Sequence, residues 1–280
     1  MKLLRIGEIG RERACVLDAD GRARDVSGLV GDFGPDTAEG LIQRLSGIDL
    51  TTLPVIDPAG QRIGAPMAQP RNIYCIGLNY SDHAEEANLP LPKHPILFNK
   101  SSGTYCGPND PILWSDKMTK LDWEVELAVV IGKPALNVSE AEALSHVLGY
   151  ATANDVSERA WQMDFSGQWS KGKSYPNFCP VGPWLVTPDE LGDAMSLDMA
   201  LDVNGEPMQR GNTSKMVFDV AQIISHLSGF LRLEAGDIIC TGTPPGVGMG
   251  KTPPIYLKPG DVVSLGIEGL SRQTQTVTRS

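Results

Sequence analysis

Apolar and polar residues alternate between residues 121 and 132, with the period of two that is typical of a β-strand. Glu124 and Glu126 would project from one face of this strand. The opposite face would carry the apolar residues Val125, Leu127, Val129 and Ile131. The pattern therefore predicts a strand with one face toward a core and another face that holds two carboxylates.

Short segments of strand-like composition recur along the chain, bounded by Gly, Pro, Asn and Asp. We predict strands at residues 14–17, 23–26, 71–77, 149–155, 237–240 and 262–267. The Asn204-Gly205 pair lies between two extended runs, so it predicts a hairpin turn within residues 201–206.

The predicted helices are few and short. The polar stretch Ser81–Asn88 favours one helix. Ser139, with Glu142 three residues later, forms a capping-box pattern that would open a second helix through Val147. Apolar residues at helical spacing predict a third, core-facing helix at residues 214–231. The fold class is therefore α+β and dominated by β-strands.

The first 66 residues have a pattern of their own. They hold short strand segments on either side of a turn at residues 18–21, and they end in a stretch rich in Pro and Gly at residues 53–60. This part contains no His and no compact acidic cluster. We therefore predict a small, β-rich N-terminal domain at residues 1–66 and a catalytic domain at residues 67–280.

Charge and composition narrow the range of partners. Lys and Arg total 24 against 34 acidic residues, and the resulting net charge of −10 would repel nucleic-acid phosphates and anionic lipids. No apolar segment resembles a signal peptide or approaches the roughly 20 residues that span a bilayer. The five cysteines form no Cys-x-x-Cys pair, which indicates free thiols in a reducing compartment. We expect a cytoplasmic protein that binds neither nucleic acid nor membrane.

Three acidic residues are candidates for a metal site. Glu124 and Glu126 would repel each other unless water or a cation separates them. Asp155 closes an extended run of small and aromatic residues, where an unpaired carboxylate would be costly to bury. Mg²⁺ and Mn²⁺ prefer such oxygen ligands. From the spacing alone, a solvated strand face explains the two glutamates equally well, so both interpretations stay open at this point.

Six motifs follow one another between residues 71 and 269: Ile76–His83, Trp123–Leu127, Asn154–Arg159, Lys171–Tyr175, Val203–Glu206 and Thr241–Gly248. In this order they resemble the fumarylacetoacetate hydrolase superfamily, and in particular its bacterial branch that hydrolyses diketo sugar acids. The resemblance implies a mixed β-roll/β-sandwich core with a small N-terminal domain, assembled as a homodimer or higher homo-oligomer. It also implies metal-dependent hydrolysis of a C–C bond in a small anionic 2,4-diketo acid. The substrate would be 2,4-diketo-3-deoxy-L-rhamnonate or a related acylpyruvate, and the products pyruvate and a hydroxy acid such as lactate.

The same resemblance implies roles for individual residues. The ligands of Mg²⁺ or Mn²⁺ would be Glu124, Glu126 and Asp155. The catalytic residues would be His83, Glu86, Lys173 and Gln162. His83 would activate water, and Glu86 would orient the imidazole of His83. The substrate-binding residues would be Arg159, Thr243 and Tyr80. The chain departs from several acylpyruvate-cleaving relatives at Leu78, where they carry a basic residue, so their substrate preference does not transfer directly.

Two other functions stay open. A lyase or decarboxylase of the same superfamily, of the ureidoglycolate lyase or oxaloacetate decarboxylase type, would bind similar chelating substrates. A non-catalytic binding protein would be marked by loss of His83, Glu86 or Lys173, and all three are present. Residues 246–252 resemble a phosphate-binding loop, but Pro245 stands where the first glycine belongs, so nucleotide binding is not expected.

Overall fold

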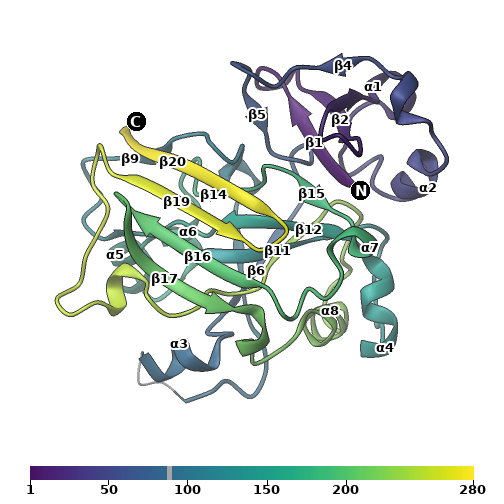
Figure 1. Cartoon of the computed structure of the whole chain (residues 1–280). Coiled ribbons are helices and arrows are strands. Elements are labelled where there is room, and N and C mark those ends of the chain that lie inside the picture. The colour runs from purple at the N-terminus through teal and green to yellow at the C-terminus, as the bar shows by residue number, and fades with distance from the viewer. Residues whose placement is uncertain (87–89) are drawn as a thin grey trace.

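A long mixed sheet forms the backbone of the computed structural model, which describes residues 1–86 and 90–280 (Figure 1). In spatial order its strands are β4 (Val55–Ile56), β3 (Ala23–Asp25), β2 (Arg13–Leu17), β1 (Lys2–Ile6), β15 (Leu185–Val186), β12 (Val147–Asn154), β11 (Val125–Ile131), β18 (Ile238–Cys240), β6 (Ile73–Gly77) and β7 (Ile96–Lys100); β5 (Ile63–Gly64) also pairs with β1. The β18–β6 pair is parallel, whereas β11 is antiparallel to both of its neighbours.

A second, antiparallel-rich sheet lies across the first (Figure 1). Its strands are β17 (Glu206–Asn212), β16 (Asp198–Val203), β19 (Val262–Ile267), β20 (Ser271–Arg279) and β9 (Ile112–Trp114). Two short pairs complete the strands: β10 (Leu121–Asp122) with β13 (Ser157–Glu158), and β8 (Tyr105–Cys106) with β14 (Cys179–Pro180). The prediction of a β-dominated α+β fold is confirmed.

The helices are short and lie around the sheets. The α-helices are α1 (Ser27–Val30), α2 (Leu41–Leu45), α3 (Ser81–Glu86), α4 (Glu140–Ala143), α5 (Arg159–Met163), α6 (Ser170–Lys173), α7 (Pro188–Leu191) and α8 (Val220–Ser228). The 3₁₀ turns are η1 (Leu50–Thr52), η2 (Ser102–Thr104), η3 (Leu144–His146), η4 (Thr213–Lys215) and η5 (Gly248–Gly250). Among the residues that the structure describes, none of these helices is long and apolar enough to cross a membrane.

Strand β11 has the predicted alternation, but both of its faces are covered. Its odd-numbered residues, Val125 to Ile131, join the core between the two sheets, together with residues of β16 and β19. Ala128 and Val130 point to the other side and belong to a second apolar cluster. A solvated face is therefore excluded for Glu126, which is 2% exposed.

Two predicted helices are shorter than expected. Helix α8 begins at Val220 rather than at residue 214, because Asp219 accepts a hydrogen bond from Gln222 N and caps the helix there. Helix α4 has the predicted capping box, but it ends at Ala143, and Val147 already belongs to β12. Helix α3 covers Ser81–Glu86, and Ala87 and Asn88 of the predicted segment lie outside the described residues.

The hairpin and most predicted strands are present. Asn204 and Gly205 have φ values of 53° and 82°, as a two-residue turn of type I′ requires, and they connect β16 to β17. The N-terminal strands also form as predicted, but β1 pairs with β15 and so extends the main sheet. A domain boundary near residue 66 stays a prediction.

Candidate active site

The antiparallel pair β11–β12 brings the three candidate carboxylates together. Val125 is paired with Asn154, so Glu124, just before β11, lies beside Asp155, just after β12. The backbone N–H of Asp155 donates to the carbonyl oxygen of Glu124 at 2.9 Å. Oxygen atoms of Glu124, Glu126 and Asp155 lie within 4.8 Å of one another, and all three residues are buried. Residues about 30 positions apart thus form one acidic group.

Three buried basic residues contact this acidic group. Lys173 Nζ donates to Glu124 Oε2 at 2.7 Å and to Asp155 Oδ2 at 2.6 Å. Lys100 Nζ lies 2.5 Å from Asp155 Oδ1. Arg159 Nη2 donates to Glu124 Oε1 at 2.6 Å. The group is therefore an ion-pair network in which Glu124 and Asp155 each meet two cations.

The two glutamates differ in their proton affinity. Burial alone would raise the pKa of Glu124, but the charges of Lys173 and Arg159 outweigh it and hold that pKa well below its ordinary value. Burial raises the pKa of Glu126 well above its ordinary value, and the neighbouring carboxylates of Asp155 and Glu124 raise it further. Glu126 accepts one hydrogen bond, from Gly242 N at 2.8 Å.

This donor set fits a divalent metal ion. Three buried carboxylates with converging oxygen atoms are ligands that hard cations such as Mg²⁺ and Mn²⁺ prefer. The added positive charge would relieve the repulsion that raises the pKa of Glu126. The residues present can therefore bind such an ion.

A His–Glu pair lies on α3. The spacing of three residues places His83 Nδ1 at 3.1 Å from Glu86 Oε2. Glu86 also accepts hydrogen bonds from Gly246 N, at 3.0 and 3.1 Å. Burial would raise the pKa of Glu86, but His83 and the Gly246 N–H lower it below its ordinary value. The carboxylate is thus kept ionised and fixed against the imidazole.

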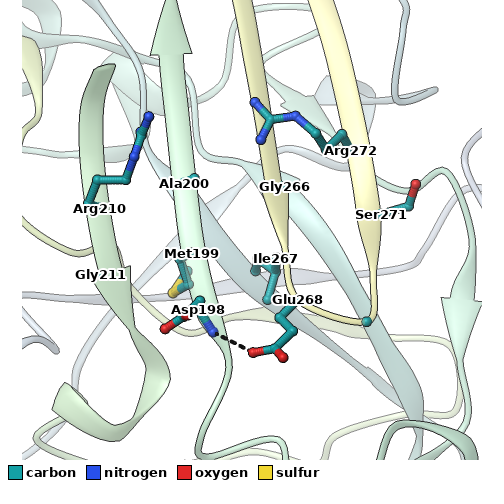
Figure 2. A pocket seen from close by; sticks show the side chains of 11 residues that line it. Asp198, Met199, Ala200, Arg210, Gly211, Gly266, Ile267, Glu268, Ser271 and Arg272 are labelled. Carbon is teal, nitrogen blue, oxygen red and sulfur yellow. Dashed lines mark hydrogen bonds between the residues drawn. The ribbon is translucent and has the colours of Figure 1, made fainter.

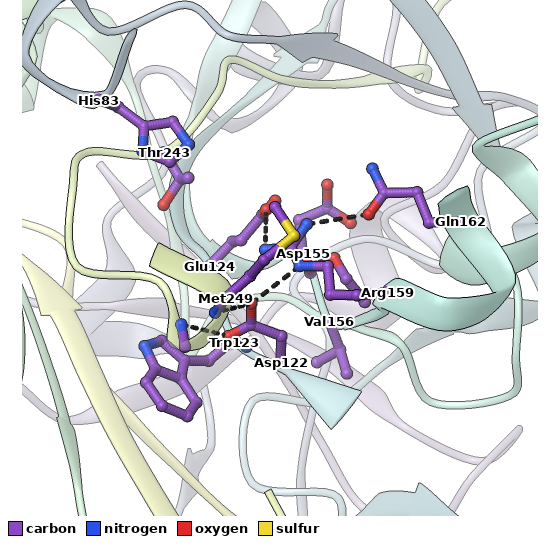
Figure 3. A network of polar contacts seen from close by, with 12 residues as sticks. His83, Asp122, Trp123, Glu124, Asp155, Val156, Arg159, Gln162, Thr243 and Met249 are labelled. Carbon is purple, nitrogen blue, oxygen red and sulfur yellow. Dashed lines mark hydrogen bonds and ion pairs between the residues drawn. The ribbon is translucent and has the colours of Figure 1, made fainter. Parts of the chain in front are cut away.

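Arg159 connects the acidic group to the loop after β18 (Figure 3). Its Nε donates to Asp122 Oδ2 at 2.8 Å, and its Nη1 donates to Gln162 Oε1 at 3.0 Å. Asp122 in turn accepts from Gly248 N at 2.6 Å and from Met249 N at 3.0 Å. Asp122 therefore holds both Arg159 and the loop after β18 in place through these hydrogen bonds. It is not one of the three carboxylates of the acidic group.

A cavity of about 460 Å³ collects most of the predicted site residues: His83, Glu86, Glu124, Glu126, Arg159, Gln162, Lys173 and Thr243. Thr243 Oγ1 donates to the carbonyl of Val125 and accepts from Gln209 Nε2, which fixes it at the start of β11. The loop residues 247 and 249–252 also line the cavity.

The structure does not bring Tyr80 to this cavity. Its side chain is fully buried in the core between the sheets, and its hydroxyl lies 3.0 Å from Met199 Sδ. Tyr80 is not among the residues that line this cavity, and its role in substrate binding stays a prediction.

Sequence reasoning missed Lys100 and an apolar part of the cavity. Lys100 ends β7 as one lysine in an ordinary strand, and its contact with Asp155 depends on the order of strands in the sheet. The apolar lining residues come from separate segments: Ile76, Leu78, Phe98, Met163, Trp169, Val247 and Met249. No short motif connects them.

A second hollow, of about 580 Å³, lies on the second sheet and is lined by residues of β16, β17, β19 and β20 (Figure 2). Its two arginines, Arg210 and Arg272, both pair with Asp202. Both arginine side chains are about half exposed, so these pairs contribute little. This hollow offers no group of converging acid, base and nucleophile.

Comparison with known proteins defines the class of the chain. The family described as "Fumarylacetoacetate (FAA) hydrolase C-terminal" matches residues 72–278, so the chain belongs to the fumarylacetoacetate hydrolase family. A 2,4-didehydro-3-deoxy-L-rhamnonate hydrolase of Sphingomonas sp. (strain SKA58) is 51% identical, over 99% of this chain and 96% of that protein.

Solved structures agree with this assignment. The fumarylacetoacetate hydrolase of Exiguobacterium antarcticum is 38% identical, with a TM-score of 0.88 over 100% of both chains. The maleylpyruvate hydrolase of Sphingobium sp. SYK-6, solved with manganese(II) and pyruvate, is 28% identical, with a TM-score of 0.83 over 100% of both chains. The predicted family and fold are therefore confirmed.

Proposed function

We propose that this chain is a divalent-metal-dependent hydrolase that cleaves a C–C bond of a small 2,4-diketo acid. The observation that carries the proposal is one cavity lined by the His83–Glu86 pair and by Glu124 and Glu126, which form a buried group of three carboxylates with Asp155. The 51% identical rhamnonate-type hydrolase supports 2,4-diketo-3-deoxy-L-rhamnonate as the substrate and pyruvate and lactate as products.

Glu124, Glu126 and Asp155 would hold Mg²⁺ or Mn²⁺. When bound, such an ion supplies Lewis-acid chemistry and positive charge near the 2-oxo acid end of the substrate. The manganese and pyruvate in the related maleylpyruvate hydrolase support this choice of ion and of product.

The chain's own residues account for the proton transfers. His83, oriented by Glu86, removes a proton from a water molecule, which attacks the 4-oxo carbon. The tetrahedral adduct then collapses, the C3–C4 bond breaks with its electron pair passing to C3, and the proton held by His83 is returned to C3 to give pyruvate. Lys173 and Gln162 donate hydrogen bonds to the oxygen that becomes negative, and each such donor is worth roughly 3–4 kcal/mol in other hydrolases. Arg159 engages the carbonyl oxygen of the Gln162 amide, which leaves the amide NH₂ group for this donation.

A panel of 2,4-diketo acids tests the proposal, with pyruvate release and loss of enol absorbance measured in the presence of Mg²⁺ or Mn²⁺. We expect turnover that chelation abolishes and added metal restores. Full turnover by metal-stripped enzyme would contradict the metal requirement, and absence of turnover across the panel would contradict the hydrolase. Oxaloacetate and ureidoglycolate in the same panel test the decarboxylase and lyase alternatives.

A further inference from the structure

One side of the cavity is formed by helix α3 and the loop after β18. Gly246 N donates to Glu86, and a Cβ added to Gly250 would stand 3.0 Å from Glu86 Cδ, so this loop packs directly against Glu86. Lys251, the next residue of the loop, lines the same cavity. Burial would raise the pKa of Glu86, but its hydrogen bonds and then the positive charge of Lys251 lower it. Lys251 therefore lies on the side of the cavity that carries the proposed base.

The ammonium group of Lys251 keeps donors for a ligand. Its Nζ donates to the carbonyl oxygen of Met208 at 3.1 Å, and within residues 1–86 and 90–280 this is its one side-chain hydrogen bond. An ammonium group carries three N–H donors, so two remain. Lys251 is half-buried, and the contact with Met208 of β17 restricts where its ammonium group can lie.

The other lysine and arginine of the described chain that line the cavity are engaged by carboxylates. Lys173 and Arg159 each pair with two buried carboxylates, and they share Glu124. Both belong to the metal-binding end of the cavity, whereas Lys251 makes no ion pair in the described structure. Lys251 is therefore the cation of this cavity that can turn to an acceptor on a ligand.

The proposed reaction indicates which part of the substrate would meet Lys251. The 2-oxo acid end would lie at Glu124 and Glu126, and the 4-oxo carbon would lie within reach of a water molecule that His83 activates. The substituent on the 4-oxo carbon then continues away from the acidic group, along the side of the cavity formed by α3 and the loop of Lys251.

We propose that Lys251 donates a hydrogen bond to a hydroxyl group on the carbon next to the 4-oxo group, and so selects substrates that carry this hydroxyl. The inference rests on the proposed function and assigns it a specificity-determining residue outside the metal site and the His83–Glu86 pair. A hydrogen bond from a charged donor is stronger than one between neutral groups. Because Lys251 is only half-buried, its contribution should be moderate, about tenfold in kcat/KM.

Two acids that differ in one oxygen atom test this assignment. They are 2,4-diketo-3-deoxy-L-rhamnonate and 2,4-dioxohexanoate, which lacks only the C5 hydroxyl. For the native protein with Mn²⁺ we expect kcat/KM about tenfold higher for the hydroxylated acid. Lys251→Met, which keeps the length of the side chain but has no donor, should abolish this preference, even if the loss of charge near Glu86 slows both acids alike. Lys251→Arg, which keeps a charged donor, should retain part of the preference.

Lys258→Met removes a charge from an exposed position further along the chain and is the matched control, which should keep the native preference. Equal kcat/KM for the two acids in the native protein would overturn this inference and leave the hydrolase in place. An equal loss for both acids in Lys251→Met would also overturn it, because the lysine would then act only through its charge on Glu86. If the native protein cleaves neither acid, the proposed function itself fails, and the role of Lys251 fails with it.

Discussion

At the residue scale, Glu126 is the carboxylate of the group whose negative charge is least compensated, since burial and two neighbouring carboxylates raise its pKa. We predict that Glu126→Gln, which keeps the volume of the side chain, weakens Mn²⁺ binding by at least about 100-fold, because even losses around the ligands cost 10- to 100-fold. Isothermal titration calorimetry measures this affinity. Glu206→Gln, at an exposed glutamate of β17, is the control, and equal affinity in both variants would show that Glu126 is not a ligand.

His83 and Glu86 should matter for turnover but not for metal binding. We predict that His83→Ala lowers kcat by about 10²- to 10⁴-fold, the usual contribution of a general base. Glu86→Ala should lower it less, because the imidazole remains but loses its oriented partner. Metal content of the purified variants separates this role from that of a ligand. Glu85→Ala, at the exposed neighbouring glutamate, is the control; a loss there equal to that of Glu86→Ala would point to a general effect on α3.

The sequence indicates some of these residues better than others. Glu124 and Glu126 are visible because strand spacing places them together, and Asp155 because it ends an apolar run. The role of Lys100 could not be predicted from the sequence. Its partner Asp155 is 55 positions away, and the two residues meet only because of the order of strands in the sheet. The expectation for Tyr80 rests on its motif, and membership in a motif does not fix the direction of a side chain, which here is buried in the core between the sheets.

At the element scale, short-range signals predicted strands and turns well and helix ends poorly. The Asn204-Gly205 turn follows from backbone conformations that few residues adopt, so it could be predicted locally. The apolar spacing in residues 214–231 extends beyond the helix, because apolar residues before Val220 also pack on the core without being helical. The cap at Asp219 decides where α8 begins.

Helix α8 should therefore depend on that cap. Asp219 and Gln222 form both hydrogen bonds of a capping box, at 2.8 and 3.0 Å. We predict that Asp219→Ala lowers the free energy of unfolding by about 1 kcal/mol, since Gln222 N loses its side-chain acceptor, whereas the bond from the Asp219 N–H to Gln222 does not use the Asp219 side chain. Urea unfolding, compared with the exposed control Glu206→Ala, measures the difference. A change no larger than that of the control would mean that packing of the apolar face alone sets the start of the helix.

At the scale of the whole molecule, assembly remains a prediction. The family resemblance implies a homodimer or a higher homo-oligomer, and light scattering of the purified protein measures its mass directly. A mass of 30.1 kDa, that of one chain, at micromolar concentration would contradict it. The sequence pattern cannot decide this, because a surface between copies of a chain exceeds other surface only modestly in apolar area, about 65% against about 57%, and its residues come from separate segments.

The contacts of the N-terminal residues with the main sheet could not be predicted from the sequence pattern. Its strands were predicted, but the pairing of β1 with β15 joins residues more than 180 positions apart. One apolar cluster also contains Leu3, Val16, Phe33 and Leu41 together with Cys75, Ala128 and Val130 of the main sheet. Neither contact could be found from local composition.

Removal of residues 1–66 should therefore unfold the remainder of the chain. It would expose the edge of β15 and strip several large side chains from a shared core, each worth about 2–5 kcal/mol. For the four N-terminal side chains named above, the total is about 8–20 kcal/mol, which is comparable to the 5–15 kcal/mol of total stability that is usual for a folded protein. We expect the 67–280 fragment to be insoluble or to lack a cooperative thermal transition. A soluble fragment with a cooperative transition and native Mn²⁺ binding would instead establish residues 1–66 as an independent domain, because the main sheet would then be stable without its N-terminal strands.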